Sequence, residues 1–136
     1  MKLAKKYYVI VCDDIRTEQE GKLSLMGVIP GDLIVNEIPC IVPNLSIIIV
    51  FEGVNFNELK SSKIMVKGPT KKDQQTMLFD PPEQKTDKIN GAKMIITMSP
   101  FRIKKEGKVK VQILTQNAKK AKTLHQFKII NKSALD

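Results

Sequence analysis

The sequence predicts an all-β protein, a two-sheet antiparallel β-sandwich of about eight short strands with little helix. Apolar residues recur with a period of two or in short runs, and no long stretch has helical spacing. Turn signals rich in Gly, Pro and Asp separate these runs every ~8–12 residues, as in sandwiches. The 136 residues suit one domain, so residues 1–136 are predicted to form a single β-sandwich domain.

The first two strands are predicted to form a hairpin. Residues 7–12 are rich in β-branched and aromatic side chains, which favour a strand partly buried on both faces and ending at Asp13 and Asp14. The polar residues 16–22 connect this strand to Leu23–Ile29, and residues 30–32 (Pro-Gly-Asp) close the second strand as a turn.

The chain then crosses to the middle of a sheet. Leu33–Val35 is expected to be a short edge strand, and residues 38–43 a crossover, because Pro39 and Pro43 each remove a ladder donor. Residues 45–51 form the most strand-like segment, with four β-branched residues in succession, and they are predicted to be a central strand.

Further strands are expected at residues 63–67, 75–79 and 92–99. Between them, residues 56–62 are predicted to be a helical turn or loop, and residues 80–91 a mobile loop.

The last third predicts a hairpin. Residues 105–107 are a turn signal, residues 108–113 alternate polar and apolar side chains, and residues 122–130 place His125, Phe127 and Ile129 on one face. If the two strands pair, a row of lysines covers their solvent face. This hairpin resembles the last hairpin of bacterial immunoglobulin-like sandwiches.

Positive charge is concentrated near the C-terminal end of the sequence. Residues 1–101 carry 13 Lys+Arg and 12 Asp+Glu, whereas residues 102–136 carry 10 and 2. This asymmetry makes an acidic partner the first binding hypothesis.

Three interpretations of the basic region stay open: a solvated face that protects a sheet edge, a site for an acidic protein, or a site for nucleic acid or another polyanion. Nucleic acid is the weaker of the binding hypotheses, because Phe101, just before the region, and Phe127 are the aromatic residues available there, and the region has one arginine. The candidate binding residues are Arg102, Lys104, Lys105, Lys108, Lys110, Lys122 and Lys128.

A second candidate is an acidic turn formed by Asp13, Asp14, Glu18 and Glu20. Four carboxylates supply enough oxygen ligands for Ca²⁺ or Mg²⁺, but their spacing is not that of the twelve-residue calcium loop. A polar hairpin turn with local ion pairs is the favoured interpretation, ahead of a partner contact and of a metal site. No metal and no cofactor is therefore expected.

Catalytic chemistry is not favoured. The single histidine, His125, cannot supply the several imidazoles of usual zinc sites and is expected to pack at the edge of the core. Cys12 and Cys40 lie beside apolar residues, which favours two inert, buried free thiols in a reducing cytoplasm, with a disulfide between them as the alternative. No nucleophile elbow or phosphate-binding loop is present in the sequence. The chain is predicted not to be an enzyme.

A family resemblance begins at residues 11–18 (Val-Cys-Asp-Asp-Ile-Arg-Thr-Glu) and continues through residues 21–28 (Gly-Lys-Leu-Ser-Leu-Met-Gly-Val). These residues resemble the opening of a family of small bacterial proteins known only as a domain of unknown function. The resemblance covers about the first 35 residues. It implies a bacterial, cytoplasmic β-sandwich and assigns no site residue.

These observations predict a non-enzymatic binding module. A protein partner is the first hypothesis, and the basic region favours an acidic one; polyanion binding through residues 102–132 is the alternative, and self-association is also open. The longest apolar runs, residues 7–12 and 47–51, fall far short of the ~20 residues that span a bilayer, so no membrane partner is expected.

Overall fold

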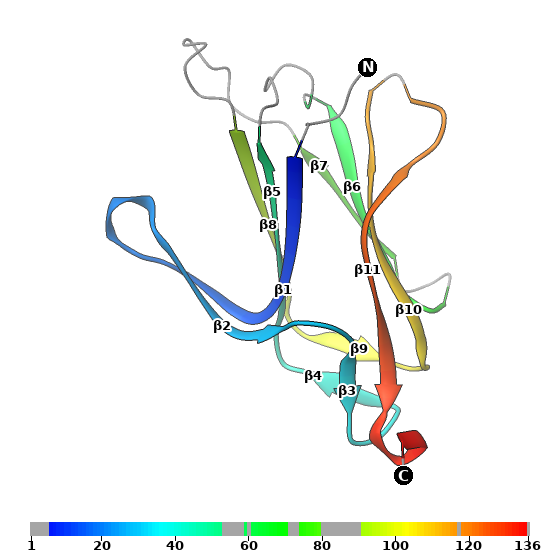
Figure 1. Cartoon of the computed structure of the whole chain (residues 1–136). Coiled ribbons are helices and arrows are strands. Elements are labelled where there is room, and N and C mark those ends of the chain that lie inside the picture. Colours follow the sequence, from blue (N-terminus) through cyan, green and yellow to red (C-terminus); the bar gives the residue numbers. More distant parts are fainter. Residues whose placement is uncertain are drawn as a thin grey trace.

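Two β-sheets packed face to face form the body of the molecule (Figure 1), which confirms the predicted all-β sandwich. The structure is a computed structural model that describes residues 6–52, 59, 61–70, 74–79, 91–116 and 118–135. Within these residues, eleven strands form the two large sheets and a third sheet of two strands. The helical content described is two 3₁₀ turns, η1 (Gln19–Gly21) and η2 (Lys132–Leu135).

The first sheet has four antiparallel strands in the order β2 (Leu23–Ile29), β1 (Lys6–Thr17), β5 (Leu45–Glu52) and β8 (Gly91–Met98). The predicted central position of β5 is confirmed, because this strand pairs with β1 on one side and with β8 on the other. The predicted end of β1 at Asp13 and Asp14 is wrong. Asp14 pairs with Met26 and Thr17 with Leu23, so the ladder with β2 extends the strand despite the low β-propensity of aspartate.

The second sheet has five strands in the order β3 (Leu33–Val35), β11 (Lys122–Asn131), β10 (Gly107–Leu114), β6 (Ser62–Lys67) and β7 (Gln74–Phe79). The predicted edge position of β3 and the predicted pairing of the last two strands are both confirmed. Strand β3 runs parallel to β11, whereas the other pairs in this sheet are antiparallel.

A third, two-stranded sheet pairs β4 (Cys40–Val42) with β9 (Phe101–Ile103). Each strand lies in a segment that crosses between the two large sheets, β4 between β3 and β5, and β9 between β8 and β10. The predicted crossover at residues 38–43 is therefore correct, with Pro39 and Pro43 outside the paired residues. The sequence did not predict β9, because this strand is determined by its pairing with β4, far away in the sequence, and by no local pattern.

The core lies between the two large sheets, where strand alternation directs apolar side chains inward. The four-stranded sheet contributes Val11, Ile47, Ile49, Phe51, Met94 and Ile96, and the five-stranded sheet contributes Ile64, Val66, Val109, Val111, Ile113, Phe127 and Ile129. Of the predicted turn at residues 56–62, residues 56–58 and 60 lie outside the described residues and Ser62 already belongs to β6; of the predicted mobile loop at residues 80–91, residues 80–90 lie outside them. None of the helical segments described has the length and apolar character needed to cross a membrane.

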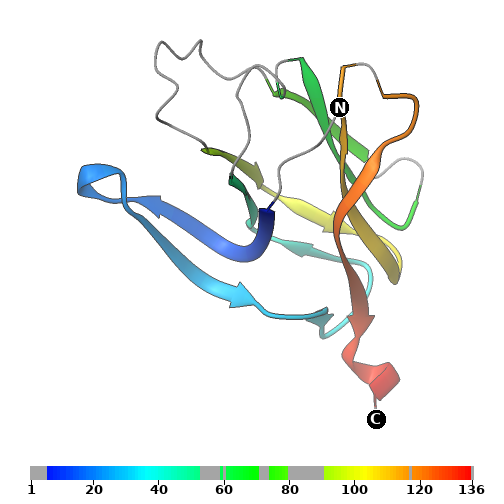
Figure 2. The same cartoon turned by 45° about the horizontal axis from the view of Figure 1, so that its top comes forward.

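A hairpin arm leaves the body of the sandwich. Strand β1 bends sharply after its first half, and its second half with β2 projects away from the two sheets (Figures 1 and 2). We call residues 13–28 the arm; they comprise the second part of β1, the connecting tip and most of β2. The tip is closed by the Glu18 N–H, which donates to the carbonyl of Lys22 at 2.7 Å. At the tip, Glu20 and Gly21 have φ of 63° and 75°, in the left-handed region.

Candidate interaction surfaces

A row of four lysines crosses the outer face of the five-stranded sheet. Lys108 of β10 is directly opposite Lys128 of β11, and Lys110 of β10 is directly opposite Lys67 of β6. Val109 and Val111, which alternate with the β10 lysines, are fully buried, so the lysines point outward. We call Lys67, Lys108, Lys110 and Lys128 the lysine row.

Like charges face each other at close range in the lysine row. Directly opposed Cβ atoms on antiparallel strands are ~4.5–5.5 Å apart, and opposed like charges destabilise a sheet. Two carboxylates lie close to the row, but both accept backbone N–H groups: Asp32 from Lys128 at 2.8 Å, and Glu106 from Asn131 at 2.6 Å. In the described part of the chain, no carboxylate forms an ion pair with the row.

The other predicted basic residues lie elsewhere. The Nζ of Lys122, at the opposite end of β11 from Lys128, is 5.1 Å from the ring centre of Tyr7, a cation–π contact. Arg102 lies on β9, and Lys104 and Lys105 follow it in the turn before β10. The sequence-predicted basic face is therefore split, with Lys108, Lys110 and Lys128 in one place and the remaining four residues outside it.

Arg102 lines two hollows in the surface. One, of ≈ 210 Å³, is lined by residues that include Gln74, Met98 and Arg102. The other, of ≈ 560 Å³, is lined by residues that include Cys40, Arg102 and Lys104. Their linings offer cationic groups and apolar surface.

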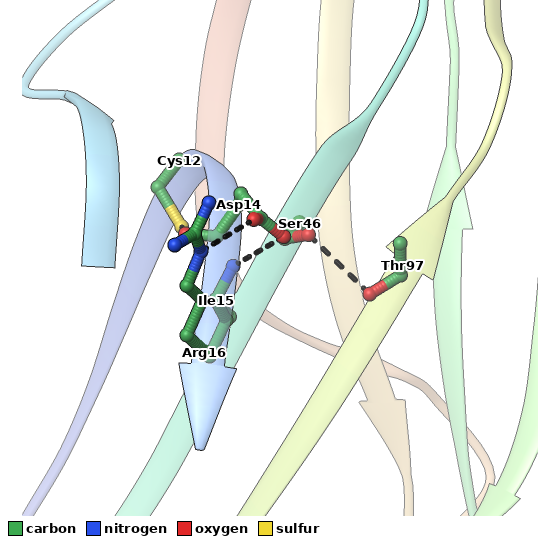
Figure 3. Close-up of polar contacts among 6 residues, drawn as sticks. All are labelled: Cys12, Asp14, Ile15, Arg16, Ser46 and Thr97. Carbon is green, nitrogen blue, oxygen red and sulfur yellow. Dashed lines mark hydrogen bonds and ion pairs between the residues drawn. The ribbon is translucent and has the colours of Figure 1, made fainter. Parts of the chain in front are cut away.

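The four carboxylates of the predicted acidic turn are spread along the arm. Asp13 and Asp14 lie within β1, so they are strand residues and not turn residues. Asp14 Oδ2 is 3.5 Å from Arg16 Nε, and Asp14 Oδ1 accepts the N–H of Ile15 at 3.0 Å (Figure 3). Glu18 and Glu20 are exposed at the tip. Among the described residues, no three or more His, Cys, Asp or Glu side chains come together in a group that would hold a metal ion.

Strand β2 presents a free, uncharged edge. It is the outermost strand of its sheet, and all seven of its residues, Leu-Ser-Leu-Met-Gly-Val-Ile, lack charge. Met26 and Val28 are 46% and 50% exposed. Edge strands of natural proteins are usually blunted by charge, proline or shortness, and an uncharged one is a template for pairing with another chain.

Apolar side chains continue from the arm onto the outer face of the four-stranded sheet, where Ile48 and Cys12 are buried. Ile10, Ile48 and Ile95 lie directly opposite one another on three neighbouring strands. In the next row Cys12 is opposite both Ser46 of β5 and Val28 of β2. Figure 3 shows Ser46 and Thr97 pointing toward each other, with their hydroxyl oxygens 3.3 Å apart.

Both cysteines are free thiols, as predicted. Cys12 is buried, and its burial together with the charge of Asp13 raises the pKa of its thiol above the usual value. The Sγ donates to the carbonyl of Asp14 at 3.5 Å. Cys40, also predicted to be buried, is only half-buried, because its short strand lies at the rim of a hollow.

His125 lies at the edge of the core. The ladder between β10 and β11 shifts register after Val111, so that Leu124 takes the buried position and His125 is half-buried. The predicted common face of His125 with Phe127 and Ile129 is confirmed, because the three residues lie opposite Val111, Val109 and Gly107 and the bulge falls beyond them, at Leu124. The imidazole ring centre is 6.2 Å from that of Phe127, and burial lowers the pKa of His125 below its usual value.

The fold and these surfaces define a β-sandwich with a lysine row on one sheet and a projecting edge strand on the other. The chain belongs to a family of unknown function, DUF6941, whose model matches residues 7–126. The match runs from β1 into β11, well beyond the segment that carries the resemblance in the sequence. No curated protein and no solved structure matches the chain.

Proposed function

We propose that this chain is a non-enzymatic protein-binding module whose binding element is the arm. The observation that carries the proposal is the free edge of β2, an uncharged strand with Met26 and Val28 exposed and unpaired backbone groups along its outer side. An extended segment of a partner that adds to such an edge gains main-chain hydrogen bonds, and side-chain contacts give selectivity.

The energetics of a projecting ribbon support this function. A two-stranded hairpin with no hydrophobic face to pack against is at best marginally stable in water. In β2 no residue reaches full burial within the chain, and Met26 and Val28 lie opposite Asp14 and Cys12 on the ribbon. A partner that covers these side chains would stabilise the arm by burying apolar surface, at roughly 25 cal/mol per Å².

The test uses Met26→Lys, which places a charge on the exposed side of β2 and blunts the edge. Its matched control is Ile41→Lys, because Ile41 is also exposed, at 61%, but lies on β4. Each tagged protein is used to capture partners from native lysate, with nuclease and at moderate salt. We expect at least one partner protein to be captured by wild type and by Ile41→Lys but not by Met26→Lys. Identical protein sets from all three, or partners that vanish with nuclease, would count against the proposal.

The second candidate function is binding of a polyanion by the lysine row. The observation that favours it is the pair of Lys–Lys oppositions, Lys108–Lys128 and Lys67–Lys110. A merely solvated face is better served by interspersed charges of both signs, whereas rows of like charge are a local cost that an anionic ligand removes. An acidic protein surface and a nucleic acid backbone both meet this requirement.

We propose further that the sandwich is immunoglobulin-like. In immunoglobulin domains strand B pairs with A and E, and strand F pairs with C and G. Strand β5 pairs with β1 and β8, and β10 pairs with β6 and β11, the same relations when β1, β5, β6, β8, β10 and β11 are taken as A, B, C, E, F and G. A bacterial, cytoplasmic setting is proposed with it, and the two free thiols support a reducing compartment.

A further inference from the structure

We infer that the partner of the β2 edge is a second copy of this chain, and that two molecules pair their β2 strands antiparallel about a two-fold axis. The inference rests on the proposed function, because it uses the same strand, and it names the occupant. The two four-stranded sheets would then join into one continuous sheet across the dimer.

Strand β2 meets the special requirement of pairing with itself. In an isologous interface each residue faces a residue of the same strand, so any charge near the centre is opposed by a like charge. Strand β2 has no charged residue, and the chain carries none between Lys22 and Asp32. In a pairing centred on the middle residue of β2, Met26 faces the Met26 of the second copy, and the exposed sulfur-containing side chains cover each other.

The other edge strands of the two large sheets are less suited to pairing with a second copy of themselves. Strand β3 has three residues, which is too short for a stable ladder. Strand β8 carries the exposed Lys93, and β7 begins with the exposed polar residues Gln74 and Gln75. Among the described edges of the two large sheets, β2 alone combines length, exposed apolar side chains and the absence of charge and polar blunting.

The charge distribution favours antiparallel pairing of two arms. Residues 13–22 carry four negative and two positive side chains, a net charge of −2, although the whole chain carries +9. Strand β2 runs from the tip of the arm toward the body, so in an antiparallel pair each acidic tip is directed toward the body of the other copy, and the residues outside 13–22 carry a net charge of +11. Two bodies of like charge thus approach through the segments that reduce their repulsion.

A two-fold dimer is also a closed assembly, to which no third copy can be added through the same surface. If the acidic arm of one molecule bound the lysine row of the next, the contact would be heterologous and would propagate into open chains. Pairing of β2 with β2 uses each free edge once and leaves the lysine row of both copies exposed.

The oligomeric state of the purified full chain tests the inference. Light scattering after size exclusion, over about a hundredfold range of concentration, should give twice the 15.3 kDa of the chain at the upper end. Met26→Lys should shift the protein to the monomer, because two ammonium groups would meet at the axis, whereas Ile41→Lys should remain dimeric. A monomeric wild type over the whole range would overturn the inference.

A charge-swap experiment separates a specific interface from loss of folding. Met26→Glu should be monomeric by itself for the same reason as Met26→Lys. When the two variants are mixed, the carboxylate faces the ammonium group and dimers should return. Monomers in the mixture, with circular dichroism of both variants like that of wild type, would refute self-pairing through β2. If wild type is monomeric and Met26→Lys still loses a lysate protein, the proposed function stands and only this inference fails.

Discussion

Cys12 and Cys40 differ in how far each thiol is removed from water. Cys12 has no exposed surface, and its raised thiol pKa leaves little thiolate at neutral pH. Cys40 is half-buried at the rim of a hollow. We therefore expect a thiol reagent to label one cysteine rapidly in the native protein, and the second only in denaturant. Cys40→Ser should abolish the rapid phase and Cys12→Ser should leave it. Two rapid thiols in the native protein would contradict the burial of Cys12.

His125 gives the protein a pH-dependent stability of known sign. Its pKa in the folded state lies below the usual 6.5, so the folded protein favours the neutral imidazole. The stability associated with that neutral form is complete above pH 6.5 and is lost as the pH falls through the lowered pKa. His125 is the chain's only histidine, so few other side chains titrate in this window.

We accordingly expect the melting temperature of wild type to fall more than that of His125→Gln when the pH is lowered from about 8 to about 5. Carboxylates that begin to titrate at the lower end affect both proteins alike, so the difference between the two curves isolates His125. Equal losses in wild type and variant would show that the imidazole is not held away from water.

At the scale of elements, Gly27 fixes the shape of the arm. Its φ is 66°, in the left-handed region, and a Cβ atom at this position would overlap the carboxylate of Asp13 on the neighbouring strand. Gly27→Ala should therefore destabilise the arm by ~1–3 kcal/mol. Gly31→Ala is the matched control, because its Cβ meets no atom within 4 Å. Hydrogen exchange of the amides in residues 13–29 measures the effect, and equally slow exchange in both variants would refute it.

The sequence predicted the elements whose own residues determine their structure. Strand β5 was predictable because its run of β-branched residues favours a central strand, and β2 and β10 because turn signals and alternation mark them. The continuation of β1 through Asp13 and Asp14 was not predictable, because the ladder with β2 determines it. The bulge beside Leu124 likewise arises from the pairing of β10 with β11 and from no local signal.

At the scale of the whole molecule, the candidate surfaces depended on which strands become neighbours. The alternation of residues 108–113 pointed to Lys108 and Lys110, and pairing with the last strand added Lys128. Lys67 was missed as a member of the row because it joins through the ladder of β6 with β10, two strands far apart in the sequence. The projecting arm was not predictable either, since alternation shows which face is apolar but not whether a second sheet covers it.

One experiment on the lysine row distinguishes a polyanion-binding site from a face that is only solvated. Replacing Lys108, Lys110 and Lys128 by Ser should weaken the binding of a labelled oligonucleotide, single-stranded or duplex, measured by fluorescence anisotropy. For duplex DNA the slope of log affinity against log salt should fall by up to about 3, since each phosphate contact contributes ~0.9. The matched control replaces the exposed Lys104, Lys119 and Lys120, which lie outside the row, and loses the same charge.

The thermal stability of the same two variants is the second measurement of this experiment. Relief of the Lys108–Lys128 opposition should raise the stability of the row variant by ~0.2–1 kcal/mol, while the control variant should change little. Loss of affinity in the row variant alone, with a melting temperature that rises, would mean that the sheet retains like charges for a ligand. If both variants lose the same weak affinity, net charge alone accounts for the binding, and the row is a solvated face that keeps the sandwich soluble.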